Sequence, residues 1–76
     1  MTTLSVAPIK VMIVEDYKLT RVGLRCALNQ HDEIEVINEA ENAEDALKMI
    51  EQKAPDVVIM DLGLPDMNGL EATMKI

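Results

Sequence analysis

The sequence predicts an α/β fold built on a parallel sheet, and two patterns support that prediction. Short apolar runs alternate with longer stretches in which apolar residues recur at helical spacing, so strands and helices follow one another along the chain. The run at 57–60 shows no polar alternation, which is typical of a strand buried on both faces of a parallel sheet. We therefore expect strand, helix, strand, helix, strand and the start of a third helix, joined by right-handed crossovers.

The first expected strand covers 9–14 and follows a mixed segment at 1–8 that we expect to be a flexible tail. A helix from about 17 to 29 comes next. Its apolar residues form two rows: Thr20, Leu24, Ala27 and Leu28 make up the first, and Leu19, Val22 and Cys26 the second. Only one row can face the sheet fully, although both are buried if neighbouring helices cover the second.

The alternating segment at 34–38 predicts an edge strand with Glu35 turned outward. Asn42 is placed to cap a second helix. The inner stripe of that helix consists of Ala43, Ala46, Leu47 and Ile50, whereas Glu44, Asp45, Lys48 and Glu51 face water. Pro55 lies between this helix and the third strand, and the segment at 70–75 has a helical pattern again.

Acidic residues directly follow two of the predicted strands. Glu15 and Asp16 come after the first strand, and Asp61 comes after the third. Ligands of open parallel sheets bind beyond the carboxyl ends of the strands, so the three carboxylates are expected to converge at one edge of the sheet. Gly63 and Pro65 then favour a tight, non-helical loop close to Asp61.

A cluster of three carboxylates needs a compensating cation or bound protons. Two carboxylates about 4 Å apart repel by roughly 4 kcal/mol at an effective dielectric constant of about 20. Mg²⁺ takes oxygen ligands and readily adds a phosphate oxygen, so it suits two carboxylates and a loop carbonyl. Taken alone, Asp16 is explained equally well as a helix N-cap, and Asp61 better as a turn or cap residue. Glu15 favours the metal site, because a cap needs no second acid.

These residues carry a resemblance to a known family. The pair E-D after the first strand, R-V-G-L-R on the first helix and D-x-G-x-P-x-M-x-G after the third strand resemble the receiver domain of a two-component response regulator. The helix motif is similar to that of the NarL/FixJ subfamily, whose members add a C-terminal helix-turn-helix. The resemblance runs from Lys10 to Ile76 and implies the first half of a flavodoxin-like sheet with strand order 2-1-3. Residues 9–76 are thus expected to form a partial receiver domain.

The resemblance also implies roles for individual residues. Asp61 would accept a phosphoryl group from a sensor histidine kinase, Asp16 would bind Mg²⁺ directly, and Glu15 would bind it through water. Gly63 would supply a backbone carbonyl to the same ion. Family members carry a Ser or Thr after the fourth strand and a Lys after the fifth, both beyond Ile76, so we expect this chain to bind Mg²⁺ weakly and to be phosphorylated poorly. It would act as a phosphoacceptor and not as an enzyme.

Partners follow from the same resemblance and from the predicted topology. The second apolar row of the first helix would dock on the kinase, and DNA would be bound only through a C-terminal domain. A third strand without a neighbour on one edge favours a homodimer, formed by edge pairing or by exchange of elements. A non-catalytic module that only dimerises or binds a partner is the alternative. A haloacid-dehalogenase-like phosphatase needs a second Asp two positions after the first, and Gly63 stands there.

Composition disfavours several other classes of function. The chain has 14 acidic and 7 basic residues and a net charge of −7, which argues against nucleic acid or an anionic membrane as a direct partner of this segment. No apolar stretch approaches the roughly 20 residues that a membrane span needs. The first seven residues lack the features of a secretory signal, and a single cysteine suits a reducing compartment. We therefore expect a cytoplasmic location.

Overall fold

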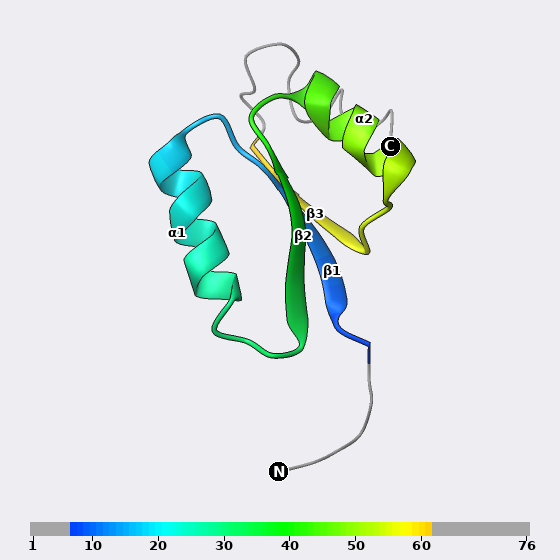
Figure 1. Cartoon of the computed structure of the whole chain (residues 1–76). Helices are drawn as coiled ribbons and strands as arrows, with labels where there is room; N and C mark the ends of the chain where they lie inside the picture. Colours follow the sequence, from blue (N-terminus) through cyan, green and yellow to red (C-terminus); the bar gives the residue numbers. More distant parts are fainter. Residues whose placement is uncertain (1–6, 62–76) are drawn as a thin grey trace.

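In a computed structural model that describes residues 7–61, the chain forms a three-stranded parallel sheet with one helix on each face (Figure 1). The strands are β1 (Ile9–Val14), β2 (Ile34–Ala40) and β3 (Val57–Met60), and the helices are α1 (Lys18–Leu28) and α2 (Ala43–Gln52). β1 lies between the other strands in the order β2-β1-β3, and both pairs are parallel. The predicted fold class and strand order are confirmed. Positions 1–6 of the expected tail, the loop with Gly63 and Pro65, and the helical segment at 70–75 lie outside the described residues.

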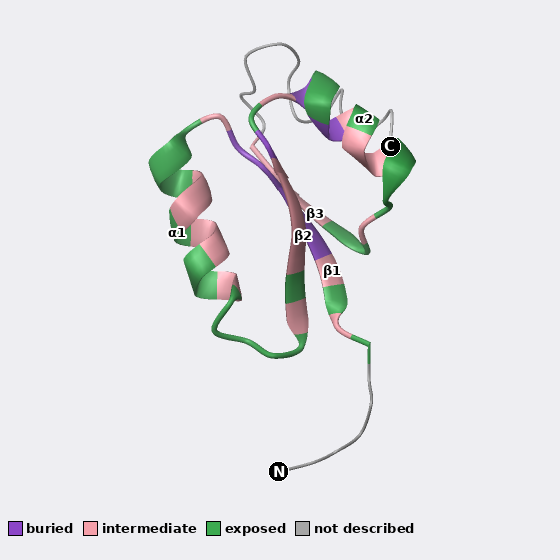
Figure 2. Ribbon diagram, in the orientation of Figure 1, coloured by how far each residue is buried: buried purple, intermediate pink, exposed green. Residues whose placement is uncertain are grey.

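The core is centred on β1, whose last four residues are buried (Figure 2). Met12, Ile13 and Val14 are completely shielded from solvent. Successive side chains of a strand point to opposite faces, so Met12 and Val14 share one face of the sheet. The buried cluster on that face is completed by Ala40, Ala43 and Ala46. The small side chains on α2 let this helix lie close to the sheet.

Helix α2 presents the predicted faces to the core and to water. Ala43 and Ala46 are buried, and Ile50 packs against their cluster. Met49 packs there as well, although the predicted stripe omitted it. The residues assigned to the solvent side, Glu44, Asp45, Lys48 and Glu51, are all exposed. Neither α2 nor α1, the helices of the described part, is long and apolar enough to cross a membrane.

Asn42 caps α2 as predicted, because its side-chain oxygen Oδ1 accepts a hydrogen bond from the backbone N–H of Asp45 at 2.8 Å. We expect Asn42→Ala to lower the free energy of unfolding by about 1 kcal/mol, since that N–H loses its acceptor. Urea denaturation measures the change. Asn42→Ser keeps a capping oxygen and should stay close to the wild type. Equal losses in both variants would contradict the capping role.

Helix α1 contacts the sheet with a mixed face. None of its residues is buried (Figure 2). Leu24 and Leu28 of the first predicted row are half-buried, but so are Arg21 and Arg25, which occupy the same side of the helix. In the second row Leu19 is 86% exposed. The interpretation with both rows buried is therefore wrong for the described part of the chain, where no neighbouring helix covers the outer side of α1.

Strand β2 extends to Ala40, two residues beyond its predicted end, and contains a β-bulge. Val11 pairs with Val36 and Met12 with Asn38, so Ile37 is an extra residue on β2. Without it, Val36 and Ala40 would share a face. The bulge shifts this alternation, so that Ala40 enters the core on the α2 side and Glu39 turns toward α1.

Strand β3 is less buried than its sequence predicts. Val57 is 46% exposed, and the other three residues are half-buried. Within residues 7–61, β3 pairs only with β1 and forms an edge of the sheet, which explains why the prediction of burial on both faces is wrong for this part. Asp56 secures the start of this pairing: its N–H donates to the Lys10 carbonyl at 2.8 Å, and its carboxylate accepts from the Lys10 N–H at 2.9 Å.

Candidate metal centre

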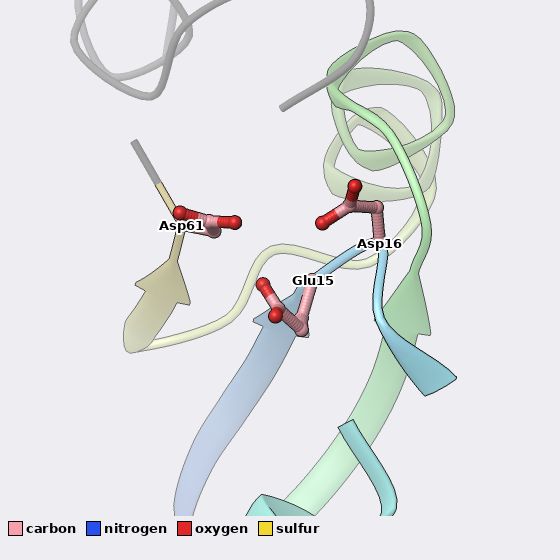
Figure 3. A group of neighbouring side chains, drawn as sticks. All are labelled: Glu15, Asp16 and Asp61. Atoms are coloured by element: carbon pink, nitrogen blue, oxygen red, sulfur yellow. The ribbon is translucent and has the colours of Figure 1, made fainter. Parts of the chain in front are cut away.

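Three carboxylates gather where β1 and β3 end. Glu15 and Asp16 follow β1, Asp61 follows β3, and one ligand oxygen from each lies within 4.8 Å of the others (Figure 3). Backbone hydrogen bonds beyond the strand ends hold this arrangement. The Glu15 N–H donates to the Ala40 carbonyl, and the Asp61 N–H donates to the Val14 carbonyl, each at 3.0 Å. The predicted convergence of the three acids is therefore present in the structure.

Glu15 is the most enclosed of the three acids. Only 7% of it is exposed, in a position where the core of β1 ends. Burial raises the pKa of Glu15 above its ordinary value, and a hydrogen bond with Asp61 and the negative charges of Asp61 and Asp16 raise it further. A backbone hydrogen bond from Tyr17 acts in the opposite direction. The site therefore disfavours a third negative charge when no cation accompanies it.

Asp16 lies in the same site and does not cap α1. The N-cap position is Tyr17, which makes no side-chain capping hydrogen bond. One oxygen of Asp16, Oδ1, is buried and has no hydrogen-bond partner in the described part of the chain. A buried polar atom without a partner costs about 1–3 kcal/mol, so a bound cation would stabilise this position. The donor set consists of carboxylate oxygens alone, which fits a hard divalent cation such as Mg²⁺.

A group of charged residues beside the site escaped prediction from the sequence. The Arg21 side chain donates to the Glu15 carbonyl oxygen at 2.9 Å and forms ion pairs with Glu39 at 3.5 Å and with Glu41 at 3.3 Å. Arg25 forms a second ion pair with Glu39 at 2.9 Å. The signal was present in the spacing, because two arginines four residues apart share one side of a helix. The β2 bulge that turns Glu39 toward them left no comparable pattern.

The family model of the response regulator receiver domain matches residues 11–76 of this chain. The chain belongs to the response regulator receiver family. The matched range includes both acidic segments of the site and extends across most of the chain. Gly63, the expected carbonyl donor, falls within the match but outside the described residues.

Curated relatives of this receiver include transcriptional regulators. The chain is 46% identical over 68 residues to the response regulator UvrY of Escherichia coli strain K12, covering 90% of this chain and 31% of UvrY. It is 40% identical over 67 residues to the transcriptional regulatory protein YdfI of Bacillus subtilis strain 168, covering 88% of this chain and 32% of YdfI. The receiver thus spans about a third of the length of these relatives.

Solved structures give the same fold. A two-component response regulator of the LuxR family from Aurantimonas sp. SI85-9A1 superposes with a TM-score of 0.86 at 34% identity. The match covers 92% of this chain and 50% of that one. The sheet of this receiver is therefore part of a flavodoxin-like fold, in agreement with the order β2-β1-β3.

Proposed function

We propose that this receiver accepts a phosphoryl group from a sensor histidine kinase on Asp61, with Mg²⁺ held by Glu15, Asp16 and Asp61. The main support is the convergence of the three carboxylates within 4.8 Å. The buried Asp16 Oδ1 without a described partner supplies a second reason to expect a cation there. Under the same proposal, Glu15 acts through a water molecule and the backbone carbonyl of Gly63 completes the protein ligands.

The transfer needs one bond to form and one to break. A carboxylate oxygen of Asp61 attacks phosphorus, and the P–N bond to the donor imidazole breaks. The bonding electron pair leaves with the nitrogen, which takes up a proton, and Asp61 becomes an acyl phosphate. When bound, Mg²⁺ neutralises negative charge on the phosphoryl group and on the carboxylates around it. The receiver residues mainly position the reacting atoms.

Asp61 is better placed than Glu15 to meet a donor. Glu15 is buried, whereas Asp61 is half-buried and lies just after an edge strand of the described sheet. Glu15 also has the raised pKa, which makes its carboxylate form less available. We therefore assign the covalent step to Asp61 and metal binding to all three acids. The chain would itself be the acceptor that becomes phosphorylated, and it would not act as an enzyme.

Partners of the receiver belong to the same proposal. The second apolar row of α1 supplies a docking surface for the kinase, since Leu19 is 86% exposed and Cys26 is exposed as well. The acyl phosphate would add a charge of about −1.5 to −2 and change how the receiver contacts an output domain. Relatives named as transcriptional regulators support a separate DNA-binding domain as that output. We also propose a homodimer through the outer edge of β3, which pairs only with β1 within residues 7–61, or through exchange of elements, in a cytoplasmic protein.

Phosphoryl labelling tests the proposal directly. The chain is incubated with phosphoramidate, a small donor with a P–N bond, with and without Mg²⁺. We expect mass spectrometry to detect one added phosphoryl group, at low yield, on Asp61 and only in the presence of Mg²⁺. Labelling at another residue, or equal labelling without Mg²⁺, would contradict the proposal.

A non-catalytic interaction module is the second candidate, and the exposed Leu19 favours it because such a surface serves any helical partner. The two candidates differ in Mg²⁺ binding. A phosphoacceptor shifts the amide resonances of Glu15, Asp16 and Asp61 when Mg²⁺ is added. If these resonances stay unchanged and no phosphoryl group is added, the interaction module is the better explanation.

A further inference from the structure

The Arg21 side chain connects three separate segments beside the acidic site. It reaches the backbone carbonyl of Glu15 in the β1–α1 loop, Glu39 at the end of β2, and Glu41 just after β2. Only 11% of the side chain is exposed, although it belongs to a helix without a buried residue. A largely enclosed, forked guanidinium with several acceptors holds those acceptors in a defined arrangement.

Glu39 reaches Arg21 only because of the bulge in β2. The extra residue turns Glu39 to the face of the sheet that α1 covers, where it also pairs with Arg25. The side chain of Glu39 is 22% exposed, and its carboxylate is shared by the two arginines. Bulges commonly redirect side chains next to functional sites. Here the bulge places Glu39 where it can form an ion pair with Arg21.

The charges of this group balance. Arg21 and Arg25 carry two positive charges, and Glu39 and Glu41 carry two negative ones. The contact of Arg21 with the acidic site is made to a neutral backbone carbonyl and not to a carboxylate of the site. The charge of Arg21 is therefore matched by its own glutamates, and its effect on the site is one of position.

We propose that Arg21 is a positioning residue for the metal site. By fixing the Glu15 carbonyl against β2, it orients the backbone from which the side chains of Glu15 and Asp16 project. The Glu15 N–H, bonded to the Ala40 carbonyl, fixes the other side of the same residue. The Glu15 N–H is bonded directly to Ala40, and the Glu15 carbonyl is linked to Glu39 through Arg21. Both backbone groups of Glu15 are therefore connected to the end of β2. This inference rests on the proposed Mg²⁺ site.

Two substitutions separate position from charge. Arg21→Gln removes both the charge and the fork, whereas Arg21→Lys keeps the charge and loses the fork. We expect both variants to bind Mg²⁺ about tenfold more weakly than the wild type, the lower end of losses seen when residues supporting metal ligands are changed. Arg25→Gln is the matched control, since it removes a charge and a Glu39 contact from the same helix but none at Glu15. Its Mg²⁺ affinity should equal that of the wild type.

Amide resonances of the folded chain, followed during Mg²⁺ titration, report affinity without a contribution from unfolded molecules. If Arg21 acted through its charge, Arg21→Gln would bind Mg²⁺ more tightly and Arg21→Lys would match the wild type. If Arg21 only stabilised the fold, both variants would melt earlier but keep the wild-type affinity. Either outcome would overturn the proposal.

Hydrogen exchange without metal gives a second measurement that does not depend on the proposed function. We expect the Glu15 amide to exchange faster in both Arg21 variants and at the wild-type rate in Arg25→Gln. Unchanged exchange at Glu15 in the Arg21 variants would refute the positioning role. If the Arg21 variants exchange faster at Glu15 but the wild type binds no Mg²⁺, the metal site is contradicted, whereas the role of Arg21 in anchoring the loop is supported.

Discussion

Asp61→Asn is expected to abolish Mg²⁺-dependent phosphoryl labelling of the chain and to weaken Mg²⁺ binding at least about tenfold, equivalent to about 1.4 kcal/mol. The amide nitrogen and oxygen of Asn carry no negative charge, so the position loses its nucleophile and one anionic ligand of the site. The side chain keeps nearly the same size, and the backbone bond from residue 61 to the Val14 carbonyl remains possible. Intact-mass spectrometry measures the labelling, and amide shifts measure the affinity.

The control for this prediction is Asp32→Asn. Asp32 is an exposed acid in the link between α1 and β2, so the substitution makes the same change of net charge far along the chain from the strand ends that form the site. Labelling and affinity should remain at wild-type values. Labelling that persists in Asp61→Asn, or an equal loss of affinity in the two variants, would show that Asp61 has no special role.

Glu15→Gln is expected to stabilise the metal-free chain at neutral pH. The pKa of Glu15 is raised in the folded state by burial, by its hydrogen bond with Asp61 and by the neighbouring charges, so the folded chain binds a proton there more tightly than the unfolded chain. Stability contributed by this group is therefore present below the unfolded pKa of about 4.3 and is lost as the pH rises through the higher folded value. Gln cannot ionise and avoids that loss.

Thermal unfolding at two pH values checks the sign. Without metal, the variant should melt a few degrees above the wild type at about pH 7, where 1 kcal/mol corresponds to roughly 4–8 °C in a domain of this size, and close to it at about pH 4. Added Mg²⁺ should raise the melting temperature of the wild type more than that of the variant, because the variant lacks one carboxylate. A variant that is less stable than the wild type at pH 7 without metal would contradict the electrostatic account of this site.

The fold was predictable because its main signals are local. The apolar runs at 9–14 and 57–60 predict strands, and the stripe of α2 predicts which face of that helix is buried. The structure confirms these elements and the cap at Asn42. The strand order was implied by the resemblance to the receiver family, and the structure confirms it as well. The site was predictable for the same reason. Acids that directly follow neighbouring parallel strands are placed at the same edge of the sheet, and the register of those strands then brings the acids together.

The remaining features depend on contacts that no local pattern encodes. The bulge at Ile37 changes which face Glu39 occupies, and only the paired strand reveals it. The half-buried arginines of α1 leave no signal in its apolar rows, because a charged side chain at helical spacing is typical of an exposed face. The burial of β3 was overestimated since the amount of cover depends on which segments lie beside a strand, and this information is absent from the strand itself.

Strand register decides whether the acidic site exists at all. Met60 lies opposite Val14, and the next residue, Asp61, meets Glu15 only in that alignment. Slippage of β3 by a single residue would place Met60 or Leu62 there and turn the carboxylate to the other face. Mg²⁺ would then bind and stabilise only the chain with the correct strand alignment. Its binding would therefore report that both crossover connections had formed.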